Sequence, residues 1–179
     1  MKLAHITLKV DRFGNTVRRN YVTPAEVMLL TAEHRQNAGG NPILSVQEVA
    51  ESSLRSLLAD AEAERDKLQA KYDIDQDDTS ITEEIRERRI TSLRSRIVNA
   101  NDRIDHLNGL IAISTASPAN EKRRLVSRYG AKKVEVVFPG RIPQIPSSFE
   151  EAREAGNEAT TFDPNDHLAG HIAVADGKS

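Results

Sequence analysis

The chain has 179 residues, of which 38% are hydrophobic, 29% are charged and 4% are aromatic, and it has no Trp. Such a supply of aliphatic side chains suits a narrow helical seam better than a broad globular core. The formal net charge of −2 gives no overall basic field for nucleic acid or an anionic membrane. The absence of Cys excludes disulfides, thiolate nucleophiles and zinc held by Cys.

Two features of the sequence bear on targeting. The N-terminus, beginning Met1-Lys2-Leu3, has no apolar region of the kind found in signal peptides. The longest strongly apolar run, Leu110 to Ile113, is far shorter than the ~20 residues of a membrane helix. We therefore expect a soluble protein that is made in the cytoplasm and does not bind a membrane.

Residues 1–44 are predicted to form a small β-hairpin followed by a short helix. Residues 3–10 alternate between apolar and polar side chains, which is the period of a half-exposed strand, and residues 16–22 can return as its partner. Thr23-Pro24-Ala25-Glu26 is typical of a helix start, with Thr as the cap, Pro in the first turn and Glu reaching back to the cap amide. An isolated β-hairpin has only marginal stability in water, so this one should pack on another element or pair with a partner chain.

Residues 45–113 are predicted to form a long antiparallel helical hairpin that resembles a coiled coil. Capping boxes begin at Ser45 and Ser80, and the acidic stretch 73–79 is the predicted turn. Apolar residues of the second helix recur at intervals of three and four, the period of a left-handed coiled coil. They are Ile90, Leu93, Ile97, Ala100, Ile104, Leu107 and Ile111.

Charge and apolar pattern predict a register for this hairpin. If facing residues have numbers that sum to about 154, Leu57 meets Ile97 and Ala61 meets Leu93. The acidic side chains of residues 60–66 then face the Arg-rich segment 86–96. Each exposed pair contributes only ~0.2–1 kcal/mol, but the common pattern favours the antiparallel orientation. The candidate seam residues are Leu54, Leu57, Ala61, Leu93, Ile97, Ile104 and Leu107.

Residues 114–156 are predicted to form a short α/β segment, and residues 157–179 an extended tail. A helix opened by Ser117-Pro118 should end at Gly130, and Val134 to Phe138 should form a strand. Further on, a Pro-rich arm precedes a short helix capped by Ser148. The tail is polar and should be ordered only where it docks. The predicted fold class is therefore mainly α.

Strand edges and extended arms gain backbone hydrogen bonds from a neighbouring chain, so they are predicted as docking surfaces. The candidate docking residues are Ile6, Leu8, Val10, Phe138, Pro143 and Pro146.

A basic cluster offers an alternative function, that of a helical adaptor associated with nucleic acid. It could contact phosphate groups. Apart from Tyr129 no aromatic residue is interleaved with it, so a solvated helix face, or one paired with acidic neighbours, is the preferred interpretation. The cluster lies in segment 122–133 and consists of Lys122, Arg123, Arg124, Arg128, Lys132 and Lys133.

Catalytic chemistry is not predicted. His167 and His171 lie four residues apart near Asp163 and Asp166, and such a group could hold a metal and make a hydrolase, the third interpretation. However, no Glu follows His167 and Gly170 interrupts the motif. No glycine-rich phosphate loop, nucleophile elbow or dinucleotide fingerprint occurs. We therefore predict no enzyme activity, no catalytic residue, no metal and no cofactor.

Two segments resemble parts of small structural proteins of tailed bacteriophages. They are residues 21–30, YVTPAEVMLL, and residues 134–149, VEVVFPGRIPQIPSSF. The resemblance implies a non-enzymatic virion component, located in the virion and made in the host cytoplasm. It also implies assembly with copies of itself or with a capsid, portal or tail protein, at the head–tail junction among other positions.

Overall fold

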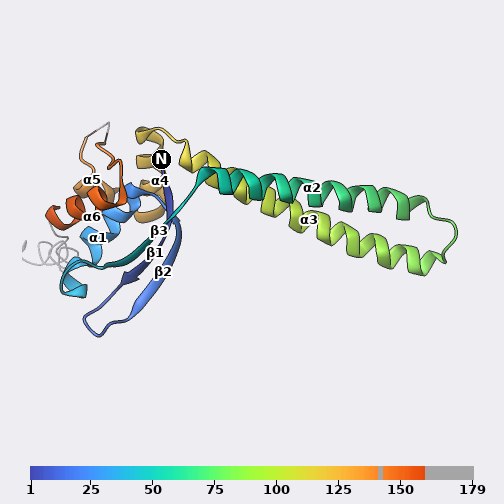
Figure 1. The fold of residues 1–179 in the computed structure, drawn as a ribbon, viewed down its shortest axis with the longest axis horizontal. Coiled ribbons are helices and arrows are strands. Elements are labelled where there is room, and N and C mark those ends of the chain that lie inside the picture. The colour runs from blue at the N-terminus through green and yellow to red at the C-terminus, as the bar shows by residue number, and fades with distance from the viewer. Residues whose placement is uncertain (141–142, 160–179) are drawn as a thin grey trace, which may run out of the picture. The chain divides into compact units, whose positions relative to one another are not determined.

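The computed structural model describes residues 1–140 and 143–159, and the chain divides into two compact units. The first unit contains Met1–Glu48 and the described residues from Ala116 onward, and the second contains Val49–Thr115. Both are drawn in Figure 1. The protein is mainly helical with a small sheet near the N-terminus. Thus segments 1–44 and 114–156, predicted as separate parts, belong largely to one unit.

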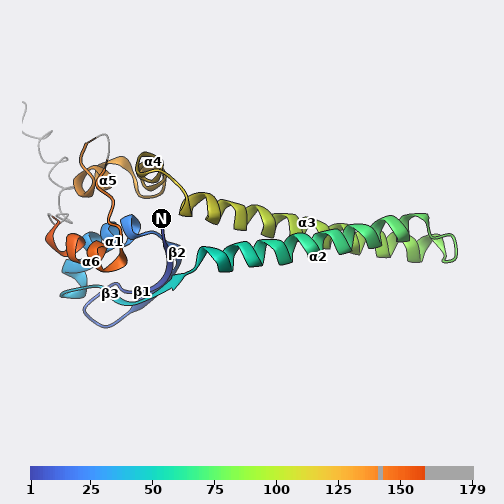
Figure 2. The same cartoon turned by 45° about the horizontal axis from the view of Figure 1, so that its top comes forward.

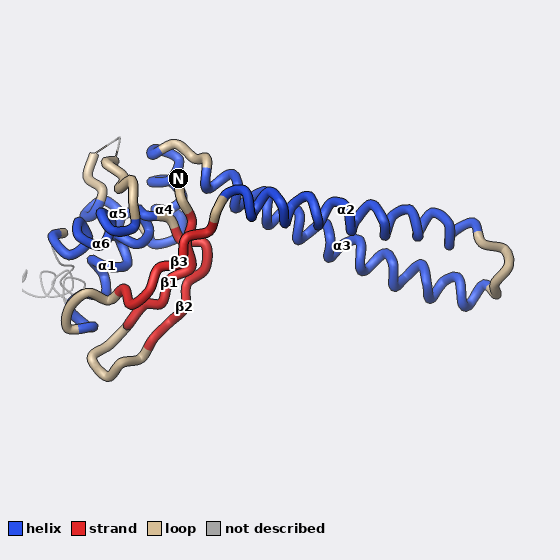
Figure 3. Tube along the Cα trace, in the orientation of Figure 1, coloured by secondary structure: helices blue, strands red, loops and turns tan. Residues whose placement is uncertain are grey.

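A three-stranded sheet takes the place of the predicted β-hairpin. Its strands are β1 (Leu3–Lys9), β2 (Thr16–Val22) and β3 (Ile43–Val49), in the order β2-β1-β3 (Figure 3). β1 and β2 are antiparallel, as expected. The backbone N–H of Lys9 donates to the Pro42 carbonyl at 2.8 Å, and Lys2 pairs with Glu48, so β3 also runs antiparallel to β1.

The capping box predicted at Ser45 is therefore wrong. Residues Ile43–Val49 are a strand, and the long helix begins at Glu51. The physical reason is contact with residues that are distant in the sequence. Ile43 is buried in the same core cluster as Leu8 of β1, and β3 pairs with the edge of β1 that the predicted hairpin left open.

The helices of the first unit are α1 (Pro24–Ala38), α4 (Pro118–Tyr129), α5 (Ala131–Val137) and α6 (Phe149–Glu158). Side-chain oxygens of Thr23, Ser117 and Ser148 accept hydrogen bonds from backbone N–H groups of the first turns, so three predicted caps are confirmed. α1 ends at Gly39, whose φ of 72° is left-handed.

Helix α1 lies between two hydrophobic clusters of this unit. Its residues Val27 and Leu30 pack with the sheet and with Phe149 of α6. From its other face, Leu29 packs with α4, with α5 and with Phe138. Burial on nearly every side makes α1 the central element of the first unit.

The strand predicted at residues 134–138 is wrong, because most of this segment is helix α5. Val134, Val137 and Phe138 are all buried in one cluster with α1, while Val136 is 46% exposed. Spacings of three and four residues place the first three on one helical face, whereas a strand would have alternated them. Packing against α1 therefore overrides the β-branched composition.

The second unit consists of α2 (Glu51–Asp77) and α3 (Glu83–Ser114), which lie side by side in both views of the chain (Figures 1 and 2). Buried and half-buried residues of each helix recur at intervals of four and three, as a heptad stripe requires. On α2 they are Leu54, Leu58, Ala61, Arg65, Leu68, Tyr72 and Asp75, and on α3 Ile90, Leu93, Ile97, Ala100, Ile104 and Leu107.

The predicted register of this pair is wrong. Arg103 pairs with Glu64 at 3.7 Å, and Arg94 donates to the Tyr72 hydroxyl at 3.0 Å, so facing residues sum to 64 + 103 = 167 and 72 + 94 = 166. α2 continues to Asp77 through most of the predicted turn, which displaces the pairing.

The predicted cap at Ser80 also differs from the structure. The carboxylate of Asp78 accepts hydrogen bonds from the Ser80 backbone N–H and hydroxyl, and helix α3 begins three residues later at Glu83. These hydrogen bonds, together with the nearby charges of Arg89 and Arg86, lower the pKa of Asp78.

None of the helices within residues 1–140 and 143–159 is both long and apolar enough to span a membrane. The predicted tail from residue 160 onward, with Asp163, Asp166, His167 and His171, lies outside the described residues.

Candidate functional site

Most of the predicted seam residues are buried or half-buried on α2 and α3. Leu54, Ala61, Leu93, Ile104 and Leu107 are buried, and Ile97 packs half-buried against the cluster of Leu68, Leu93 and Ala100. Leu57 is the exception, with 39% exposure, because Leu58 holds the heptad position beside it.

The predicted docking residues were expected on an exposed surface, but their side chains are buried or half-buried in the first unit. Five of them, Ile6, Leu8, Phe138, Pro143 and Pro146, are buried within the first unit, and Val10 packs half-buried against its core. Ile6, Leu8 and Phe138 pack in the hydrophobic clusters of their own unit, and Phe138 and Pro146 also line a pocket beside α5 and α6. The apolar character of these residues therefore belongs to the core.

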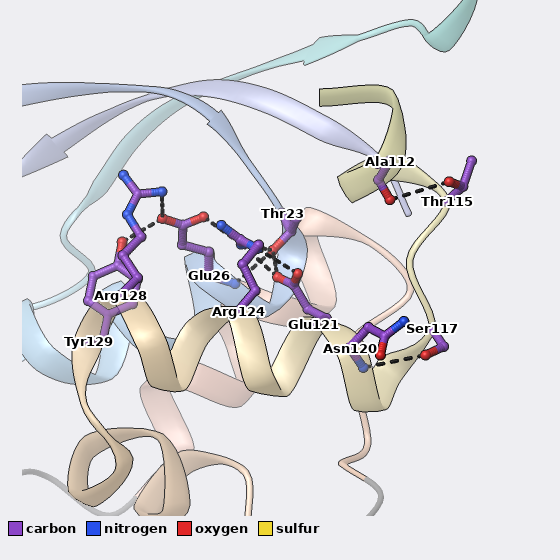
Figure 4. A network of polar contacts seen from close by, with 10 residues as sticks. All are labelled: Thr23, Glu26, Ala112, Thr115, Ser117, Asn120, Glu121, Arg124, Arg128 and Tyr129. Carbon is purple, nitrogen blue, oxygen red and sulfur yellow. Dashed lines mark hydrogen bonds and ion pairs between the residues drawn. The ribbon is translucent and has the colours of Figure 1, made fainter. Parts of the chain in front are cut away.

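A polar network between α1 and α4 contains two carboxylates, from Glu26 and Glu121, that are 0% exposed (Figure 4). Arg124 lies between them. Its guanidinium binds both oxygens of Glu121 at 2.7 Å and Oε2 of Glu26 at 2.9 Å. The hydroxyl of Thr23 donates to Glu121, and Arg128 and the Tyr129 hydroxyl bind Oε1 of Glu26.

Local structure explains why these residues meet. Glu26 occupies the first turn of α1, where the sequence predicted that it would reach back to the cap amide. Its side chain instead turns toward α4, where Arg124 and Arg128 are four residues apart and thus share one helical face.

Burial and charge shift two ionisation equilibria in the network. Burial alone would lower the pKa of Arg124, but hydrogen bonds to Glu121 and the charges of both carboxylates outweigh burial and raise it. Burial also raises the pKa of Tyr129, and its hydrogen bond to Glu26 raises it further. Both partners therefore keep their protons at neutral pH.

The chemistry of the network is that of a structural clamp. Each of the four carboxylate oxygens accepts at least one hydrogen bond from a side chain of the network, so both buried carboxylates are paired within the first unit. Removing one partner of such a buried group is strongly destabilising. The sequence signal for the clamp was weak, because Glu26 fits a capping box equally well.

The basic cluster of segment 122–133 is largely engaged within the first unit. Lys122 pairs with Glu135 at 2.7 Å and also donates to the Gly140 carbonyl, and Lys133 pairs with Glu33. Arg124 and Arg128 belong to the clamp described above. Pairing with acidic neighbours, the interpretation preferred from the sequence, fits these four side chains.

Two arginines of the Arg-rich run 86–96 pair with glutamates of their own helix, whereas Arg94 donates to Tyr72 of α2. Arg86 pairs with Glu83, and Arg88 pairs with Glu84 at 2.7 Å. The acidic run of α2 does not face them, in contrast to the predicted charge register. Such exposed pairs within one helix add only ~0.3–0.5 kcal/mol each.

A mainly apolar pocket of about 470 Å³ lies beside α5 and α6, and Met28, Phe138, Ile145 and Pro146 are among the residues that line it. The carboxylate of Glu151 is also in its lining, but it accepts hydrogen bonds from the backbone N–H and hydroxyl of Ser147, which lower the pKa of Glu151. Glu151 is therefore committed to capping α6.

Comparisons with protein-family models, with curated proteins and with solved structures found no match to this chain.

Proposed function

We propose that this protein is a non-enzymatic assembly component of a bacteriophage particle that oligomerises or docks on other structural proteins. The single observation that carries the proposal is the α2–α3 pair, which closes an apolar seam within itself. Its two helices have 27 and 32 residues, so they extend about 40 and 48 Å at ~1.5 Å per residue. Length of this kind suits a spacer or an attachment arm.

The composition of the pair supports a mechanical role. The seam buries Leu, Ile and Ala side chains, while the positions outside it are mostly charged or polar. A left-handed supercoil is the arrangement that its spacing favours. Two helices that bury each other's apolar side chains in this way need no third helix for stability. Their ends are therefore available for contact with partner proteins.

The residues that flank the loop at 78–82 are the best candidates for docking. Ile74, near the end of α2, is 69% exposed, and Ile85, in the first turn of α3, is 45% exposed. Large apolar side chains in contact with water favour burial in an interface, at ~25 cal/mol per Å² of apolar surface. We propose that these two residues contact a second copy or another protein of the particle.

Sedimentation velocity on the full-length protein tests this proposal. We expect a concentration-dependent oligomer that the double substitution Ile74→Ser/Ile85→Ser weakens at least tenfold. The matched control is Val98→Ser, since Val98 is 53% exposed on the same pair but far from the loop. A monomer at every concentration, or equal weakening by the control, would contradict docking between copies at this end.

The particle role has its own test. Phage particles purified on a density gradient should contain the protein, detected by mass spectrometry at a fixed ratio to a capsid protein. Recovery of the protein solely from the soluble fraction of the lysate would argue against a virion component. Electron microscopy of the labelled particle would then assign its position.

A further inference from the structure

The β1–β2 ribbon carries a concentration of positive charge. Residues 1–22 contain five Lys or Arg residues against one acidic residue, a formal charge of 5 − 1 = +4, in a chain whose net charge is −2. We define the basic ribbon as residues 9–19, with the cationic side chains Lys9, Arg12, Arg18 and Arg19. The negative net charge of the whole chain conceals this local excess of positive charge.

The ribbon reaches solvent on both faces. Side chains of a strand alternate between faces, yet every residue from Thr16 to Asn20 of β2 is exposed. β2 is also an edge of the sheet. Its register with β1 pairs Thr7 with Arg18 and Ile6 with Arg19, so the two arginines occupy opposite faces of the ribbon.

The tip of the ribbon is fixed by its own hydrogen bonds. One carboxylate oxygen of Asp11 accepts from the backbone N–H groups of Phe13 and Asn15, both at 3.0 Å. The hydrogen bond from the Asn15 side chain lowers the pKa of Asp11. The single acidic residue of the ribbon is thus used to hold the turn.

Phe13 stands at this tip with 94% of its surface exposed. An aromatic ring in that position contributes nothing to the core of the first unit. In the major groove, apolar side chains can contact the methyl group of thymine, so an exposed ring at the tip of a basic arm is suited to contact with base edges.

The positive charge of the ribbon is not cancelled by its surroundings. Within residues 1–140 and 143–159, Lys9, Arg12, Arg18 and Arg19 have no ion-pair partner. The acidic groups of neighbouring elements are engaged elsewhere, Glu48 with Lys2, Glu33 with Lys133, and Glu26 in the clamp.

We propose that the basic ribbon binds duplex DNA, with its four cationic side chains on the phosphates and Phe13 leading into a groove. A two-stranded β-ribbon fits the major groove, which is about 12 Å wide. Exposure on both faces lets the arginines reach the two phosphate backbones that border the groove. A flat anionic membrane would contact one face and leave the other unused. This inference does not depend on the proposed assembly role.

Fluorescence anisotropy with a labelled duplex of about 20 base pairs, long enough for two helical turns, tests the proposal on the full-length protein. Four phosphate contacts predict a slope of about −3.6 for log affinity against log salt, and about a 100-fold loss of affinity between about 50 and 200 mM salt. Affinity that does not change with salt, or the absence of binding at low salt, would overturn the proposal.

Matched variants locate the surface. Arg12→Gln/Arg18→Gln should reduce affinity at least tenfold at low salt and make the slope shallower by about 2. The control Arg89→Gln/Arg96→Gln removes the same charge from exposed positions of α3 and should change affinity less than twofold. Equal loss in both pairs would show a net-charge effect alone and would overturn the assignment.

Two further measurements complete the test. Phe13→Ser should weaken binding several-fold with an unchanged salt slope, because the ring carries no charge. Arg18→Gln alone provides a variant with minimal effect on folding, checked by circular dichroism, should the double variant unfold. Stronger binding to phosphatidylserine vesicles or to polyglutamate than to the duplex would reject DNA as the occupant.

Discussion

Gly156 shows how one residue without a side chain sets the separation of two helices. A Cβ built on it would lie 2.6 Å from the Cβ of Thr31 and 2.7 Å from the carbonyl oxygen of Met28. Helices α1 and α6 can therefore approach closely only with Gly at this position. Helix α6 continues past Gly156 to Glu158, so this glycine serves helix packing and does not end the helix.

We expect Gly156→Ala to destabilise the first unit by ~1–3 kcal/mol, the usual cost of forcing a methyl group into a packed contact. Urea unfolding followed by circular dichroism measures the change. The matched control is Gly109→Ala on α3, where a Cβ would have nothing within 4 Å. That substitution should stabilise its helix by ~0.5–1 kcal/mol. A neutral Gly156→Ala would show that α6 can move away from α1.

Among the helices and strands, the features predicted best from the sequence are those that depend on neighbouring residues alone. Caps at Thr23, Ser117 and Ser148 form because hydroxyl groups satisfy the amides of the next turn. Strand β3 and helix α5 were missed because each depends on a distant partner, β1 for the former and α1 for the latter.

The register of α2 and α3 was missed for a different reason. An apolar stripe with spacing of three and four repeats every seven residues, so several alignments bury similar side chains. The loop at 78–82 decides between them, and its position could not be read from composition alone. Likewise, the sequence assigned Leu57 to the seam, although its neighbour Leu58 continues the heptad spacing.

Replacing a leucine of α2 with aspartate distinguishes positions in the buried seam from positions on the helix surface. Leu68→Asp should destabilise the second unit by ~3 kcal/mol or more, because Leu68 is 6% exposed and an unpaired charge would be buried. Leu57→Asp should cost less than ~1 kcal/mol, since its side chain already contacts water. Thermal unfolding by circular dichroism compares the two variants, and equal losses would contradict the observed stripe.

For the whole molecule, the division into two units has a consequence for stability. The cluster of Leu68, Leu93 and Ala100 consists of residues of α2 and α3, within the unit Val49–Thr115. A compact unit with a hydrophobic cluster of its own is expected to open its backbone hydrogen bonds separately. The burial of the candidate docking residues Ile6, Leu8 and Phe138 could not be predicted, because no sequence pattern reveals which apolar face meets a core.

Hydrogen exchange measured by mass spectrometry can detect this independence. In Leu68→Asp, exchange of the amides of α2 and α3 should accelerate at least tenfold, whereas exchange in α1, α4 and α6 should stay within about twofold of the wild type. Uniform acceleration along the chain would mean that the two units open as one.

The clamp between α1 and α4 joins Thr23 to Glu121, residues separated by 98 positions along the chain. During synthesis on a ribosome, α1 therefore emerges long before the segment that neutralises Glu26 and covers Leu29. The intervening α2–α3 pair needs only local contacts and can form first. Nascent chains would then expose α1 for several seconds of elongation, an interval in which a chaperone could bind it.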